Sequence, residues 1–110
     1  AVATLELAGK RVVRLACSWR LPAGQDAVIE ASFYGTAGAA ALRNLNGSFY
    51  DFRAERFEGT TRHLLAEAPD AWGGRAGADW AERLARSRHF AEDAEELVRS
   101  AEVLDRIYGR

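Results

Sequence analysis

The side chains of this sequence that could act as acids, bases, nucleophiles or metal ligands are few and stand far apart. The two histidines, His63 and His89, have no second histidine, cysteine or carboxylate at a spacing typical of a metal site. His63 falls in a predicted strand, where a lone histidine is more often packed or solvent-facing than catalytic. His89 falls in a polar linker. The sequence therefore predicts no catalytic residue and no metal ligand.

The one cysteine and the glycines likewise predict neither a nucleophile nor a cofactor site. Cys17 alternates with Leu15 and Trp19, a pattern typical of a small buried hydrophobic residue. A single cysteine cannot form an internal disulfide, so we expect a reducing compartment and a cytoplasmic protein. The glycines of the segment 73–77 have the wrong spacing for a dinucleotide fingerprint and follow no predicted strand. We expect no cofactor site in this chain.

Size and composition predict one folded domain over residues 1–110. Of the 110 residues 48% are hydrophobic and 28% are charged, close to the average for globular domains. The net charge of −1 predicts neither a nucleic-acid partner nor a membrane partner. No apolar run reaches the roughly 18 residues that span a bilayer, and the first residues lack the pattern of a signal peptide.

Two-thirds of the chain alternates short β-rich runs with glycine, asparagine or proline breaks. This pattern predicts six strands, connected largely as antiparallel hairpins, at 2–7, 11–19, 27–34, 39–45, 48–57 and 60–66. After Pro69 the composition changes, and apolar residues recur at helical spacing over 74–86 and 90–108. Acidic residues at 92–96 suit a helix N-terminus. We therefore expect a sheet in residues 1–68 and two helices in residues 69–110.

The strands have one apolar side and one polar side. In the third predicted strand Ile29, Ala31 and Phe33 alternate with polar residues. The sequence thus predicts an α+β fold, in which a largely antiparallel, open-faced sheet of about six strands has both C-terminal helices packed on one face. Its open face would be solvated or would pair with a second copy, and we favour pairing. The candidate interface residues are Arg14, Glu30, Tyr34, Asp51, Arg53 and Glu55.

Several short phrases, in this order and spacing, together resemble one family, the Gfo/Idh/MocA oxidoreductases, which include glucose-fructose oxidoreductase and inositol dehydrogenase. The similarity covers nearly all of the chain. The phrases that carry it are Ser18-Trp19-Arg20, Phe33-Tyr34-Gly35-Thr36-Ala37-Gly38, Asn46-Gly47-Ser48-Phe49-Tyr50-Asp51-Phe52 and Glu102-Val103-Leu104-Asp105-Arg106-Ile107-Tyr108.

The resemblance implies a preceding Rossmann domain that binds NAD or NADP. It also implies an α+β domain whose open sheet forms part of the substrate pocket and commonly the subunit interface. Only the latter part is present here. The family's catalytic lysine lies in a Glu-Lys-Pro motif, but Lys10 lies between Gly9 and Arg11. The family's Asp-x-x-x-His pair is absent too, since Gly59 and Ala85 occupy the positions four before the histidines.

Two functional hypotheses follow from the sequence. In the first, the chain is the C-terminal portion of an NAD(P)-dependent oxidoreductase acting on a sugar, a polyol or a similar substrate. It then scaffolds the substrate pocket, contacts its own Rossmann domain, pairs subunits and is inactive alone. In the second, it is an independent, non-enzymatic dimeric module that uses its open sheet face for association or binding.

Overall fold

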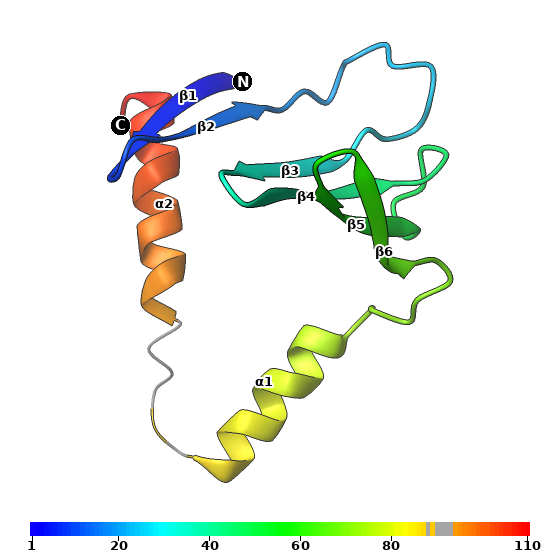
Figure 1. Ribbon diagram of the computed structural model, residues 1–110. Coiled ribbons are helices and arrows are strands. Elements are labelled where there is room, and N and C mark those ends of the chain that lie inside the picture. The colour runs from blue at the N-terminus through cyan, green and yellow to red at the C-terminus, as the bar shows by residue number, and fades with distance from the viewer. Residues whose placement is uncertain (88, 90–93) are drawn as a thin grey trace. The chain divides into compact units, whose positions relative to one another are not determined.

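The computed structural model describes residues 1–87, 89 and 94–110 (Figure 1). The described elements are six strands and two helices, so the predicted α+β class is confirmed. The strands are β1 (Val2–Leu7), β2 (Arg11–Ala16), β3 (Glu30–Gly35), β4 (Gly38–Asn44), β5 (Phe52–Glu58) and β6 (Thr61–Glu67). The helices are α1 (Arg75–Arg86) and α2 (Ala94–Tyr108).

The six strands form two antiparallel sheets rather than a single one. One sheet pairs β1 with β2, and the other has the order β3-β4-β5-β6 (Figure 1). All paired strands are consecutive in the chain. The chain divides into two compact units, Arg20–Gly73 with the four-stranded sheet, and Ala1–Trp19 with Gly74–Arg110. The prediction that helices cover one sheet face stays a prediction, because helices and four-stranded sheet belong to different units. The single-domain organisation of residues 1–110 likewise stays a prediction.

The side chain of Asn44 determines where the four-stranded sheet begins. Its Oδ1 accepts a hydrogen bond from the N–H of Ile29 over 2.9 Å. Its Nδ2 donates to the carbonyls of Ala27 and Ser48, each over 2.9 Å. These bonds satisfy backbone groups that a ladder would otherwise satisfy. β3 therefore begins at Glu30, and not at residue 27 as the sequence pattern predicts.

A polar turn sets the start of β5. The Ser48 hydroxyl accepts hydrogen bonds from the N–H groups of Tyr50 and Asp51, over 3.1 and 3.0 Å. The same hydroxyl donates to Asp51 Oδ2 over 2.7 Å. Serine in such a turn competes with strand formation. Residues 48–51 are consequently not strand, although the sequence pattern predicts a strand over 48–57.

The helices have amphipathic sequences, and none of their described residues is buried. Along α1, Arg83 lies 3.1 Å from Asp79 and Arg86 pairs with Glu82, both at the i,i+4 spacing that supports an exposed helix. α2 ends where Gly109 adopts a φ of 69°, a left-handed conformation that terminates many helices. The described part of this helix begins at residue 94, so the predicted N-terminal turn with Glu92 and Asp93 lies outside the described residues.

Candidate functional site: the two faces of the four-stranded sheet

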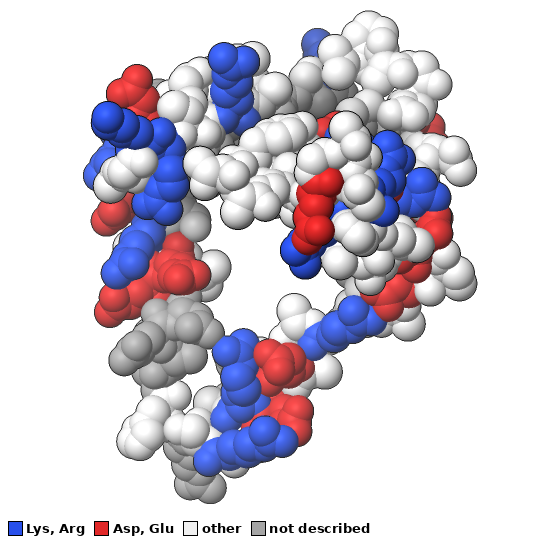
Figure 2. Space-filling model, viewed as in Figure 1, with Lys and Arg blue, Asp and Glu red and all other residues white. Residues whose placement is uncertain are grey.

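Alternation along β3 to β6 gives the four-stranded sheet two faces with different chemistry. On one face, which we call the charged face, the strand register aligns residues in three rows. In the order β3, β4, β5, β6, the first row is Glu30, Arg43, Arg53 and Glu67, the middle row is Ser32, Ala41, Glu55 and Leu64, and the third row is Tyr34, Ala39, Phe57 and Arg62. Over the side of the molecule that Figure 2 shows, acidic and basic side chains are mixed, without a large region of one sign.

The first row of the charged face consists of two ion pairs. Arg43 Nε lies 3.2 Å from Glu30 Oε1, which also accepts a hydrogen bond from Ser32 Oγ over 2.6 Å. Arg53 Nε donates to Glu67 Oε1 over 2.9 Å. Both pairs are solvent-exposed, so each adds little to the stability of the isolated sheet. The row reads acid, base, base, acid across the four strands.

These contacts shift two pKa values. The hydrogen bond from Ser32, followed by the hydrogen bond and charge of Arg43, lowers the pKa of Glu30. Because the folded-state pKa is lowered, the stabilisation is present above the ordinary glutamate range and is lost as the pH falls through the lowered value. Glu67, through its hydrogen bond and then its charge, raises the pKa of Arg53. Both shifts favour the charged forms of Glu30 and Arg53.

Glu55, in the middle row, is a buried carboxylate that lies beside the buried Ala41. It is only 6% exposed, and Arg62 Nη1 lies 3.5 Å from its Oε1. The guanidinium of Arg62 also lies 5.9 Å from the centre of the Phe57 ring, close enough for a cation–π contact. A buried charge is tolerated when it is paired. Arg62 therefore serves as the counter-ion that lets Glu55 lie beneath the surface of the charged face.

Four of the six predicted interface residues lie together on the charged face, namely Glu30, Tyr34, Arg53 and Glu55. The other two lie elsewhere. Arg14 lies in β2 opposite Thr4, in the other unit of the chain. Asp51 lies in the turn before β5, where Ser48 binds its carboxylate, and not in a strand. An interface role for any of the six stays a prediction.

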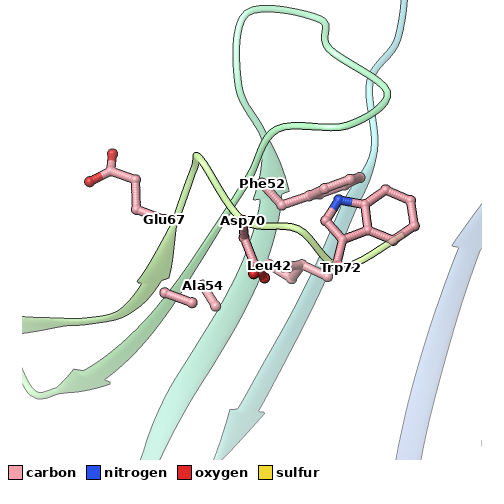
Figure 3. A pocket seen from close by; sticks show the side chains of 7 residues that line it. Leu42, Phe52, Ala54, Glu67, Asp70 and Trp72 are labelled. Atoms are coloured by element: carbon pink, nitrogen blue, oxygen red, sulfur yellow. The ribbon is translucent and has the colours of Figure 1, made fainter. Parts of the chain in front are cut away.

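The opposite face of the sheet is largely apolar near the start of β5 and carries a pocket of about 330 Å³. Its lining consists of Leu42, Phe52, Ala54, Ala66, Trp72, Glu67 and Asp70. In Figure 3 the rings of Phe52 and Trp72 meet edge to face, while the Glu67 side chain points away from them. The ring centres are 6.1 Å apart. The pocket therefore combines an aromatic wall with the carboxylate of Asp70, because the Glu67 carboxylate pairs with Arg53 on the charged face.

Trp72 is positioned by a hydrogen bond from outside the sheet. It follows β6 in the chain, and its Nε1 donates to the carbonyl of Tyr50 over 2.7 Å. This bond ties the segment after β6 to the turn before β5. Residues 69–73 separate the sheet from the first helix in the sequence, so strand periodicity could not identify Trp72. The one feature of the sequence that could have identified Trp72 as a pocket residue is that an aromatic residue closely follows Pro69-Asp70.

Neither His63 nor Cys17 is among the residues that line this pocket. His63 is exposed and lies 3.7 Å from Glu58, in line with the prediction that it is a packed or surface residue. Cys17 is exposed, so the prediction that it is buried is wrong. β2 ends at Ala16, and the backbone N–H of Cys17 instead binds the carbonyl of Ala1 over 2.9 Å. The alternation that predicted burial therefore does not extend to Cys17.

Within the described ranges, no group of three or more histidine, cysteine, aspartate or glutamate side chains is arranged to hold a metal ion. Neither described helix is both long and apolar enough to cross a membrane. In comparisons with known proteins, no family model, no curated protein and no solved structure matches the chain.

Proposed function

We propose that this chain is the subunit-pairing and pocket-scaffolding portion of an NAD(P)-dependent oxidoreductase that resembles the Gfo/Idh/MocA family. The observation that carries the pairing role is the first row of the charged face, where Glu30, Arg43, Arg53 and Glu67 place two acids and two bases side by side on an accessible surface. Such a surface carries both charge types that a second copy needs in order to be complementary.

The pocket on the opposite face supports the scaffolding role. Trp72 and Phe52 offer ring faces and edges to an apolar surface, and Asp70 contributes carboxylate oxygens that accept hydrogen bonds. This combination suits a hydroxylated ring such as a sugar or cyclic polyol, which has both C–H surfaces and O–H donors. The hydride-transferring cofactor, NAD or NADP, belongs to the preceding Rossmann domain that the resemblance implies.

Replacement of Arg53 by glutamate tests the pairing role. Light scattering coupled to size exclusion is expected to show about twice the monomer mass for the unaltered chain at high concentration. Arg53→Glu is expected to shift the equilibrium towards monomer by about ten-fold or more, since it places three acids in the first row. High salt should have the same direction of effect.

The matched control is Arg99→Glu, which makes the same charge change on α2, where Arg99 lies 3.9 Å from Glu95. It is expected to leave the mass distribution unchanged. A strictly monomeric unaltered chain at about 1 mM, a concentration at which weak specific pairs form, would contradict the pairing role. An equal effect of the two variants would contradict the charged face as its location.

The oxidoreductase assignment is tested by the coding region before residue 1. We expect that region to encode a strand followed by a glycine-rich helix start. The chain itself is expected to show no rise in melting temperature with millimolar NAD, because a ligand stabilises only a fold that binds it. An upstream region without that strand and helix start, or a clear NAD-dependent rise, would refute the assignment.

A further inference from the structure

The connection between β4 and β5 holds the dipeptide Asn46-Gly47 in a tight turn. The N–H of Ser48 donates to the carbonyl of Leu45 over 2.8 Å, which closes the turn around these two residues. Both have a positive φ, 50° for Asn46 and 76° for Gly47, as a type I′ turn requires of its central pair. The Asn46 side chain is exposed. The turn therefore presents an accessible side-chain amide directly before a glycine.

We propose that Asn46 is a site of spontaneous deamidation, at which this chain converts to aspartate and isoaspartate. In this reaction the amide nitrogen of Gly47 loses its proton to base in the solvent and attacks Cγ of Asn46. A new C–N bond forms, the side-chain nitrogen leaves as ammonia, and a cyclic imide remains. Water then opens the imide at either of its carbonyls. The whole change consumes water, releases ammonia and involves no oxidation or reduction.

The attacking nitrogen is not engaged elsewhere. A β-turn uses the N–H of its last residue, here Ser48, and leaves that of its third residue, here Gly47, without a partner in the turn. Among the residues that the structure describes, none accepts a hydrogen bond from the Gly47 N–H. Glycine also has no Cβ, so no side chain shields its nitrogen from the Asn46 amide. Both properties lower the barrier to ring closure.

The other asparagine of the sequence, Asn44, is the internal comparison. Its side chain is held in place by hydrogen bonds to three backbone groups, each over 2.9 Å. The residue that follows it is Leu45, whose branched side chain crowds the nitrogen that would attack. That nitrogen also donates to the carbonyl of Asp51 over 2.9 Å. Both reacting groups at Asn44 are thus engaged, whereas those at Asn46 are not.

Packing of the turn limits the rate at Asn46. Gly47 is buried, and a Cβ built on it would lie 3.0 Å from Cβ of Gln25 and 3.1 Å from the backbone nitrogen of Asp26. Ring closure requires rotation of Asn46 until its Cγ reaches the Gly47 nitrogen, and this close contact restrains the rotation. The reaction therefore proceeds through local opening of the turn, a smaller event than unfolding of the sheet.

The two products have different consequences for the start of β5. Aspartate keeps the original backbone and tolerates a positive φ, so it adds only a negative charge. In isoaspartate the main chain runs through Cβ and Cγ, which lengthens the turn by a carbon atom. The lengthened turn displaces the Ser48 carbonyl, which accepts a hydrogen bond from Asn44 Nδ2. Isoaspartate at position 46 therefore weakens the hydrogen bonds that Asn44 makes.

Incubation of the folded chain at mildly alkaline pH tests the proposal. Anion exchange separates the products by their added negative charge, peptide mass spectrometry locates them, and labelling by an isoaspartyl methyltransferase identifies isoaspartate. Asn46 is expected to convert at least about ten-fold faster than Asn44, which corresponds to a difference of ~1.4 kcal/mol in barrier. The isoaspartate product is expected to unfold at a lower urea concentration than Asn46→Asp, which has the same charge on an unaltered backbone.

Asn46→Gly is the matched control, because glycine adopts the φ of this position without strain and has no amide to lose. It is expected to form no acidic product over the same period. Equal rates at Asn44 and Asn46 would overturn the proposal, and so would a folded chain whose Asn46 stays intact while the urea-unfolded chain converts. Equal urea midpoints for the isoaspartate product and Asn46→Asp would overturn the effect on the start of β5.

Discussion

Asn44→Ala is expected to lower the free energy of unfolding of the Arg20–Gly73 unit by about 3 kcal/mol. The Asn44 side chain makes three hydrogen bonds with backbone groups, to the N–H of Ile29 and the carbonyls of Ala27 and Ser48. Each such bond contributes about 1 kcal/mol, and a buried group left without a partner adds a further penalty. Removal of this one side chain therefore breaks all three hydrogen bonds at once.

Asn44→Asp is expected to be about as severe. A carboxylate can still accept from Ile29, but it cannot donate to the carbonyls of Ala27 and Ser48, and its charge repels their oxygens. The matched control is Asn46→Gly. Asn46 adopts a φ of 50°, a conformation that glycine reaches without strain, so this variant is expected to be neutral or slightly stabilising.

Urea unfolding measures these variants. Replacement of Trp19 and Trp80 by phenylalanine leaves Trp72 as the single fluorescent indole, and Trp72 lies in the same unit as Asn44. The midpoint is expected to fall for both Asn44 variants and to hold for Asn46→Gly. A loss below about 1 kcal/mol for Asn44→Ala would mean that the three hydrogen bonds do not define the start of β3.

Local signals were sufficient to predict the number and order of the strands. Glycine or asparagine between β-rich runs marks the Gly35–Gly38 and Glu58–Thr61 connections, and in each case the flanking strands pair antiparallel. β1 matches its predicted range, while the other strands shift by one to four residues at their ends. Hairpins are predictable because the turn and both strands are neighbours in the sequence.

The division into two sheets could not be predicted, because it depends on contacts between residues distant in the sequence. The Asn44 side chain binds backbone groups 15 and 17 positions earlier, and it thereby takes the place of a strand partner for the Ile29 N–H and the Ala27 carbonyl. The pairing of β6 with β5 is irregular as well. Ala66 pairs with Ala54 and Leu64 with Glu55, which leaves Leu65 as an extra residue that periodicity alone does not reveal.

For the site, alternation predicted which residues share a face but not what they bind. Glu30, Tyr34, Arg53 and Glu55 share the charged face as their spacing predicts. That Glu55 is buried beneath Arg62 depends on the register of β5 against β6, which the sequence does not specify. Side-chain direction within a strand is therefore a local property, whereas ion-pair partners are set by the neighbouring strand.

Gly38→Ala is expected to cost about 3 kcal/mol, because the β4–β5 register leaves no room for a side chain at this position. A Cβ built on Gly38 would lie 2.8 Å from the carbonyl oxygen of Phe57, and the φ of 152° is one that residues with a side chain rarely adopt. Strained backbone of this kind costs of order 1 to 3 kcal/mol, and the clash with backbone adds to it.

Gly59→Ala is the matched comparison in the following hairpin. Gly59 also has a positive φ, 56°, but its Cβ would meet nothing within 4 Å. Only the conformational term of about 1 kcal/mol then applies. The difference between the two unfolding free energies, about 2 kcal/mol, isolates the contact with Phe57. Equal losses would show that β4 and β5 can separate at this point, and the rows of the charged face would then not be held in a fixed register.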